Sequence, residues 1–155
     1  VAKSLGMVIH YHNRSKLDSG KENGAIYHKT LESLMSVSDV LSVCCPASKE
    51  TINLINKKTI SLLPNGAIVT NVARGDIVDD DALIEALDSK KVSAVGLDVY
   101  KNEPKLNPGY LKHSRAFVLP HLGSATFETR TAMANLAIDN ISEFFETGSC
   151  KNKVN

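Results

Sequence analysis

The stretch AIVTNVARGDIVDDDALIEALDSKKVSAVGLDVY, residues 67–100, decides the fold. It begins with the apolar run AIVTNV and ends with SAVGLDVY, both typical of buried strands, and the segment ALIEALDSKK between them favours a helix. Asp79, Asp80 and Asp81 lie where this helix starts, where carboxylates complement the positive end of its dipole, and its lysines complement the other end. We therefore interpret the acidic triplet as a helix start and not as a metal site. A strand, a helix and a second buried strand predict a parallel sheet.

The same alternation of strands and helices extends in both directions along the chain. Gly6 favours the end of a helix over residues 1–5, and Thr30 favours the start of another over 31–37. Further strands are expected over 7–11, 39–45 and 115–119, and a long helix from Thr126 to about Glu146. Together these elements predict an α/β fold, a doubly wound parallel sheet of the Rossmann type.

Composition and charge exclude several classes of function. A net charge of +1 gives no electrostatic reason to expect nucleic acid or an anionic membrane as a partner. No apolar run approaches the roughly 20 residues needed to span a bilayer. The 3 cysteines, Cys44, Cys45 and Cys150, have no framework spacing, so we expect free thiols in a reducing compartment, the cytoplasm.

Three ionisable residues follow predicted strands. Arg74 comes after AIVTNVA, Glu103 lies a few residues beyond AVGLDVY, and His121 follows AFVLP. Open parallel sheets bind ligands beyond the carboxyl ends of their strands, so we expect these three side chains to converge on one crevice. A guanidinium, a carboxylate and an imidazole together suit binding of an anionic substrate and transfer of a proton.

Three blocks, TNVARGDIVDDDALIEAL, GLDVYKNEP and LPHLGSAT, occur in that order from residue 70 to residue 126. They resemble the signature blocks of the D-isomer-specific 2-hydroxyacid dehydrogenases. HYHNRS, after the expected strand at 7–11, is most similar to the glyoxylate/hydroxypyruvate reductase branch. The resemblance covers almost the whole chain and implies reduction of a small 2-oxo acid with NADPH or NADH.

The resemblance implies a role for each of the three ionisable residues. Arg74 matches the arginine that binds the substrate carboxylate, His121 the catalytic acid/base, and Glu103 the carboxylate that pairs with that histidine. Taken alone, Arg74 and Glu103 would be interpreted as surface loop charges and His121 as a structural histidine. The remaining histidines lie outside the matching blocks and are assigned that structural role: His10, His12, His28 and His113.

The resemblance also implies a set of cofactor contacts. Arg14 and Ser15, after Asn13, replace the acidic residue of NAD-preferring relatives and favour NADP over NAD, although Arg14 alone could be a plain loop charge. Thr51 has the alternative of capping a helix over INLI. The adenosine-ribose pocket is assigned to Asn13, Arg14, Ser15, Cys45, Pro46 and Thr51, and the nicotinamide side to Val72, Ala73, Arg74, Asp98, His121 and Gly123.

The resemblance implies that the sequence starts inside the family's cofactor domain. We expect the first strand, the glycine-rich loop and the substrate domain to be absent from this chain, and the isolated piece to be inactive. The expected organisation is a truncated NAD(P)-binding domain at 1–125, a long helix at 126–148 that leads back to the substrate domain, and a tail at 149–155.

Two alternatives to the enzyme remain open at this point. The same scaffold occurs in a dinucleotide-sensing corepressor of the same superfamily, and the chain could be an inactive truncated product. For the enzyme, the resemblance implies a homodimer with a small-molecule substrate.

Overall fold

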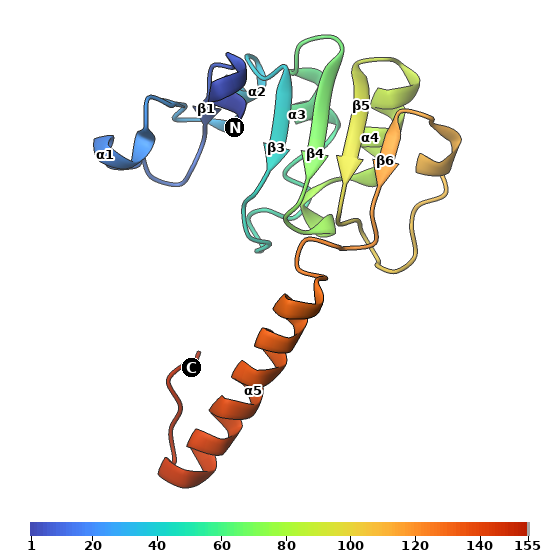
Figure 1. Ribbon diagram of the computed structural model, residues 1–155. Helices are drawn as coiled ribbons and strands as arrows, with labels where there is room; N and C mark the ends of the chain where they lie inside the picture. The colour runs from blue at the N-terminus through green and yellow to red at the C-terminus, as the bar shows by residue number, and fades with distance from the viewer. Residues whose placement is uncertain (155) are drawn as a thin grey trace. The chain divides into compact units, whose positions relative to one another are not determined.

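The computed structural model describes residues 1–154, which form two compact units, Val1–Pro120 and a second unit that begins at His121 (Figure 1). Each unit is described by itself below. Among residues 1–154, no helix combines the length and the apolarity that crossing a bilayer requires.

The first unit contains a sheet of four parallel strands in the order β3-β4-β5-β6. The strands are β3 (Val40–Val43), β4 (Ala67–Asn71), β5 (Val92–Leu97) and β6 (Ala116–Val118). The predicted parallel sheet with flanking helices is confirmed. Its register aligns the strand ends, since Val43 pairs with Asn71 and Asn71 with Leu97. Residues that follow β3, β4 and β5 therefore leave the sheet at the same edge.

Helices α3 (Lys57–Ser61) and α4 (Asp80–Asp88) lie behind the sheet in Figure 1, and α2 (Leu31–Met35) packs on α3. Apolar side chains between these helices and the sheet form the core, with Val69, Leu83, Leu87 and Val92 fully buried. The opposite face of the sheet leaves Val40, Ile68 and Phe117 exposed, because alternate side chains of a strand point to opposite faces.

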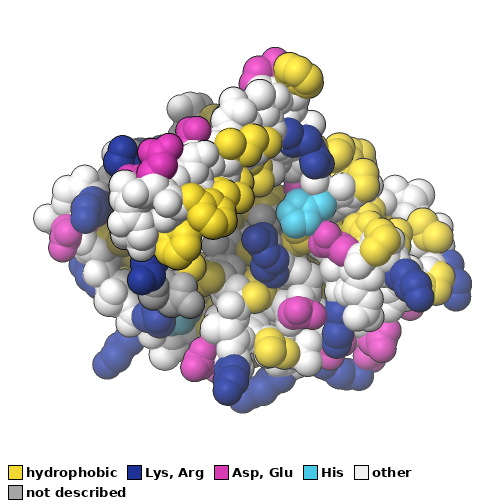
Figure 2. All heavy atoms as spheres, turned by 90° about the horizontal axis from the view of Figure 1, so that it is seen from below, with side chains coloured by type: hydrophobic (Ala, Val, Ile, Leu, Met, Phe, Trp, Pro, Cys, Tyr) yellow, Lys and Arg dark blue, Asp and Glu magenta, His cyan; other side chains and the backbone are white. Residues whose placement is uncertain are grey.

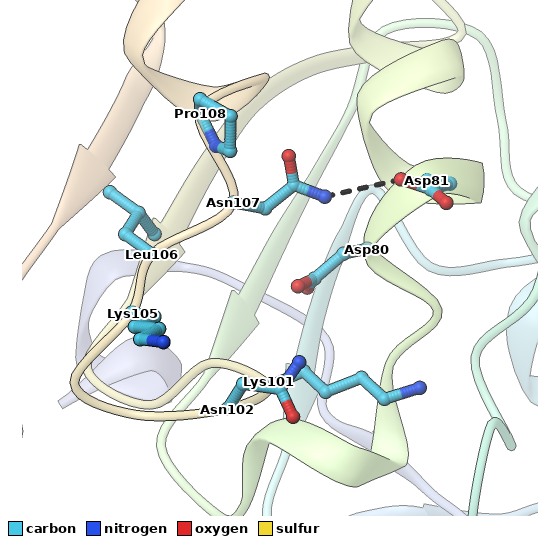
Figure 3. Close-up of a pocket in the computed structure, with 8 residues that line it drawn as sticks. All are labelled: Asp80, Asp81, Lys101, Asn102, Lys105, Leu106, Asn107 and Pro108. Carbon is cyan, nitrogen blue, oxygen red and sulfur yellow. Dashed lines mark hydrogen bonds between the residues drawn. The ribbon is translucent and has the colours of Figure 1, made fainter.

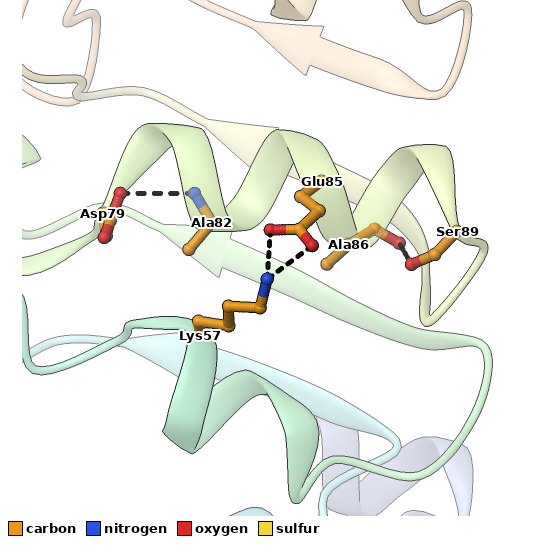
Figure 4. Close-up of polar contacts among 6 residues, drawn as sticks. All are labelled: Lys57, Asp79, Ala82, Glu85, Ala86 and Ser89. Atoms are coloured by element: carbon orange, nitrogen blue, oxygen red, sulfur yellow. Dashed lines mark hydrogen bonds and ion pairs between the residues drawn. The ribbon is translucent and has the colours of Figure 1, made fainter.

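Helix starts follow the capping residues that the sequence predicts. The side chain of Thr30 accepts a hydrogen bond from the Ser33 amide, and that of Asp79 accepts one from the Ala82 amide (Figure 4). The helix that starts at Asp79 was predicted to include Lys90 and Lys91 at its end, and this is wrong. Helix α4 stops at Asp88, before these lysines, and Lys90 has a left-handed φ of 61°. A lysine of another helix interacts with α4 instead: Nζ of Lys57, in α3, lies 2.6 Å from the Glu85 carboxylate (Figure 4).

The N-terminal segment forms a separate two-stranded parallel sheet, β1 (His10–Tyr11) with β2 (Ile26–Tyr27). Only the last two residues of the strand predicted over 7–11 pair, and β2 was not predicted, because two residues between polar neighbours give no periodic signal. The 3-10 helix η1 (Ala2–Leu5) ends at Gly6 as expected, with a left-handed φ of 81°. A one-turn helix, α1 (Ser19–Glu22), lies between the two strands in the sequence.

The second unit consists mainly of α5 (Phe127–Thr147), which Thr126 caps as predicted and which ends at Gly148. Its expected apolar stripe is present but solvent-exposed, with Ile138, Ile141 and Phe145 among the exposed large side chains. Hydrophobic side chains exposed beside charged ones are also visible in Figure 2. After α5 the chain turns back, because the Lys151 amide donates to the Glu143 carboxylate at 3.0 Å. Position 155 of the predicted tail lies outside the described residues.

The connections after β4 and β5 pack directly against each other in the first unit. The buried Gly75 begins the 3-10 helix η2 (Gly75–Ile77), and a Cβ added to it would overlap the carbonyl group of Tyr100 and the amide of Lys101. Glycine is therefore required at position 75 for close approach of two backbones, at an ordinary φ.

We predict that Gly75→Ala lowers the free energy of unfolding by about 1–3 kcal/mol, because the added methyl group must push the two connections apart. Gly20→Ala is the matched control, since nothing lies within 4 Å of a Cβ at that helical position. Urea unfolding of both variants checks the expectation. Equal stability of the two variants would contradict the close packing at Gly75.

Candidate active site

A buried amide fixes the turn that carries Arg74. Asn71, the last residue of β4, is 1% exposed. Its Oδ1 accepts a hydrogen bond from the Ala73 amide at 3.0 Å, and its Nδ2 donates to the Arg74 carbonyl at 2.9 Å. Because the first hydrogen bond is buried and the second partly buried, residues 72–74 are held in place at the carboxyl end of the sheet.

Arg74 lies exposed at the end of this turn, immediately before η2. Its Nη1 donates to the Ala73 carbonyl at 2.6 Å, which directs the guanidinium back along its own turn. A guanidinium has five N–H donors in a planar fork, so this bond is compatible with a bidentate grip on a carboxylate ligand.

Glu103 lies in the exposed connection after β5. Its Oε1 accepts a hydrogen bond from the Tyr100 amide at 3.1 Å, so the carboxylate closes a short turn over residues 100–103. Asn102 takes a left-handed φ of 61° within that turn, and the Glu103–Pro104 peptide is cis. The carboxylate is thereby tied to the backbone that packs on Gly75.

The structure therefore brings together the segments of two of the three signature blocks. Arg74 immediately precedes Gly75, and Glu103 follows the Tyr100 backbone against which Gly75 packs. Both residues leave the sheet at its carboxyl edge, where a parallel α/β sheet binds its ligands.

The residues assigned to the nicotinamide side lie at the same edge. Val72 and Asp98 directly follow the paired residues Asn71 and Leu97, and the Asp98 amide donates to the Asn71 carbonyl at 3.0 Å. Val72 is exposed and Ala73 buried. An exposed apolar side chain and a half-buried carboxylate thus follow neighbouring strands at this edge, and their role in holding a nicotinamide stays a prediction.

Thr51 organises the connection after β3. Its Oγ1 accepts a hydrogen bond from the Ser48 amide at 2.7 Å and donates one to the Pro46 carbonyl at 2.9 Å, which closes the turn after Cys45. The alternative prediction, that Thr51 caps a helix over INLI, is wrong, because the next helix is α3, capped by Asn56. Burial raises the pKa of the Cys45 thiol, which keeps it protonated and unreactive at neutral pH.

Arg14 and the Thr51 turn are electrostatically linked. Asn13, Arg14 and Ser15 are exposed after β1, and the Tyr27 hydroxyl donates to the Asn13 carbonyl at 3.3 Å. A hydrogen bond from Ser48 holds the pKa of the Glu50 carboxyl below its ordinary value, and the positive charge of Arg14 acts in the same direction. The two segments assigned to the adenosine-ribose pocket are thus close enough for their charges to interact.

His121 and Gly123 belong to the second unit, so their convergence with Arg74 and Glu103 stays a prediction. His121 has a φ of 56°, in the left-handed region that side chains other than glycine rarely adopt. Gly123 lies in a turn in which the Ala125 amide donates to the Leu122 carbonyl at 3.0 Å. Backbone strain of this kind, which costs about 1–3 kcal/mol, is concentrated at functional positions.

The four other histidines make contacts within the first unit. His10 and His28 share a hydrogen bond of 2.8 Å, and His12 contacts the His28 carbonyl at 2.9 Å. His113 lies 3.3 Å from the Asp88 carboxylate at the end of α4.

The site residues that sequence reasoning missed are Asn71 and Gly75. The signal for Asn71 was an amide inside an otherwise apolar strand, and for Gly75 a glycine directly after the arginine.

Comparison with known proteins supplies the family. The family model for the D-isomer specific 2-hydroxyacid dehydrogenase, NAD binding domain, matches residues 1–123. The chain is 40% identical over 147 residues to 4-methyl-2-oxopentanoate reductase A of Aspergillus oryzae, covering 95% of this chain and 44% of that protein. The chain spans less than half the length of curated relatives such as this one.

Two solved structures are similar to the fold described above. A glyoxylate reductase from Paecilomyes thermophila has a TM-score of 0.87 at 41% identity, covering 96% of this chain and 45% of that one. The NADPH-dependent glyoxylate/hydroxypyruvate reductase of Sinorhizobium meliloti, in complex with NADP and malonate, has a TM-score of 0.91 at 34% identity, covering 98% and 47%. The family model and the two structures agree. The chain belongs to the D-isomer specific 2-hydroxyacid dehydrogenases, and its residues 1–123 match the NAD-binding domain of that family.

Proposed function

We propose that the protein reduces a small 2-oxo acid of the glyoxylate or hydroxypyruvate type to the corresponding 2-hydroxy acid, using NADPH or NADH. The observation that supports this most directly is the packing of Gly75 on Tyr100, which joins the segments of Arg74 and Glu103 at the ligand-binding edge of the sheet. Relatives that share this architecture are named glyoxylate reductases.

Arg74 binds the substrate in this proposal. Its guanidinium grips the carboxylate of the 2-oxo acid bidentately and so fixes the neighbouring carbonyl group in one orientation. The Asn71 hydrogen bonds hold the Arg74 backbone while it does so. The guanidinium also stabilises negative charge that develops on the carbonyl oxygen.

His121, together with Glu103, transfers the proton to the carbonyl oxygen in this proposal. The His121 imidazolium donates a proton to the carbonyl oxygen during reduction, and the neutral ring removes it in the reverse direction. The Glu103 carboxylate accepts a hydrogen bond from the other ring nitrogen of His121 and so orients the ring. When bound, the nicotinamide supplies the hydride, and Val72, Ala73, Asp98 and Gly123 would hold its ring and carboxamide.

We further propose that NADPH is the preferred cofactor. Directly after β1, the residues Asn13, Arg14 and Ser15 include no acid for a 2′-hydroxyl, and Arg14 and Ser15 offer donors to a ribose 2′-phosphate. The S. meliloti reductase, which is similar over 98% of the chain, is described as NADPH-dependent and binds NADP.

For the complete gene product we propose a homodimer in the cytoplasm. The cysteines of the described residues are free thiols, which suits a reducing compartment. Large apolar side chains exposed on the sheet and on α5 offer surface for a second copy. Light scattering on the purified protein tests the oligomeric state.

The activity is tested directly by NADPH oxidation with glyoxylate and with hydroxypyruvate in the complete gene product. Turnover with either acid supports the reductase. Absence of turnover with both, in a protein that still binds NADPH, would leave the corepressor-like alternative in its place.

We predict that His121→Gln lowers kcat at least about a hundredfold, because the carbonyl oxygen then lacks its proton donor. The affinity for NADPH, measured by fluorescence titration, should change little. His113→Gln is the control, since His113 contacts only the Asp88 carboxylate among the ion pairs of the described residues. Near-normal turnover of His121→Gln would remove His121 from the mechanism.

We predict that Arg14→Ala raises the KM for NADPH about tenfold to a hundredfold, the loss expected for one charge-assisted hydrogen bond. The KM for NADH should change little, because that cofactor lacks the 2′-phosphate. Lys16→Ala is the matched control, a neighbouring cation whose Nζ lies 3.7 Å from the Glu22 carboxylate. Equal changes with both cofactors would show that Arg14 does not select NADPH.

A further inference from the structure

The connection that carries Glu103 is tied to the first turn of α4 by two hydrogen bonds. The Tyr110 hydroxyl donates to Asp80 Oδ1 at 2.9 Å, and the Asn107 side chain donates to Asp81 Oδ1 at 3.1 Å. Figure 3 shows Asn107 directed at Asp81 and the carboxylate of Asp80 beside it. Two members of the acidic triplet therefore hold a segment from another part of the chain, in addition to starting a helix.

The bond between Tyr110 and Asp80 is shielded from water. Tyr110 is 1% exposed and Asp80 9% exposed. Burial raises the pKa of the Asp80 carboxyl, and burial followed by the charge of Asp80 raises that of the Tyr110 hydroxyl far above its usual range. The hydroxyl therefore remains a donor at every pH of interest, and removing it would leave a buried acceptor without that partner.

Between Glu103 and these anchors the connection is only partly packed, since Leu106 contacts the core. A cavity of ≈ 630 Å³ separates the first turn of α4 from Lys101, Asn102 and residues 105–108 (Figure 3). Residues 101–105 are all exposed. The exposed stretch that contains Glu103 is thus held on both sides, at Gly75 before it and at Leu106 and the Tyr110–Asp80 hydrogen bond after it.

We propose that Asp80 and Tyr110 are positioning residues for the reductase, which set the place of the Glu103 carboxylate through the segment between them. The inference rests on the proposed function, since it assigns the segment a task in catalysis. Glu103 must meet the His121 imidazole within hydrogen-bond distance to orient it as the proton donor, and a displacement of about 1 Å at a reacting centre can cost a hundredfold in rate.

The test is a double-mutant cycle in the complete gene product. Tyr110→Phe keeps the buried ring and removes only the hydroxyl, and we expect kcat with glyoxylate to fall about fivefold to thirtyfold with little change in the KM for NADPH. In a Glu103→Gln background the same substitution should change kcat by less than about twofold, because there is no longer a carboxylate to position. Multiplicative effects of the two substitutions would overturn the inference.

Two further measurements separate positioning from general damage. Glu85→Gln, which alters α4 only at its exposed ion pair with Lys57 (Figure 4), should leave kcat unchanged. Asn107→Ala removes the hydrogen bond to Asp81, the second of the two that tie the connection to α4. Because Asn107 is only half-buried, the loss of kcat should be smaller, and it should depend on Glu103 in the same way. A normal kcat in both Tyr110→Phe and Asn107→Ala would overturn the proposal.

A readout independent of activity distinguishes this inference from the proposed function. The Tyr100 amide donates to Glu103, so its hydrogen exchange reports whether the carboxylate is in place. We expect faster exchange at Tyr100 in Tyr110→Phe and unchanged exchange in β4. Unchanged exchange at Tyr100 would overturn the positioning role, whereas a wild-type protein without reductase activity would overturn the proposed function alone.

Discussion

The backbone of Gly75 packs against the carbonyl of Tyr100 so closely that no side chain fits between them. This contact decides where the ends of β4 and β5 go after they leave the sheet. Sheet pairing places Asn71 beside Leu97, and Gly75 then keeps the two connections together beyond that point. Arg74 and the Glu103 segment owe their positions to this constraint, since neither side chain is itself buried.

Buried and exposed residues have separate tasks at this edge of the sheet. Asn71, Asp80 and Tyr110 are buried and bind the backbone or one another. Arg74 and Glu103 are exposed residues. A ligand carboxylate and a proton donor must be reached by charges that remain partly hydrated, while the geometry must come from groups that water cannot loosen.

Much of this arrangement could be predicted from the sequence, because the signals were local. The strands around AIVTNV and GLDVY are apolar runs, and Thr30, Asp79 and Thr126 are capping residues whose side chains bind amides three positions on. The end of α4 was predicted wrongly and the strand β2 was not predicted, since a C-terminus without glycine and a two-residue strand depend on tertiary contacts. The acidic triplet was assigned one role, although Asp80 and Asp81 also bind Tyr110 and Asn107, some 26–30 residues away. No spacing rule connects residues so far apart.

The two ends of the Glu103 segment differ in how they can change. At Gly75 the restraint is steric, because two backbones occupy the space that any side chain would need. At Asp80 it is a buried hydrogen bond between a hydroxyl and a carboxyl group, whose strength depends on the charge of the carboxyl group. Sterically fixed ends tolerate almost no substitution, whereas a hydrogen-bonded end can be shifted by exchanging its partners. Substitutions at residues 80 and 110 therefore adjust the orientation of Glu103 more easily than a substitution at residue 75 does.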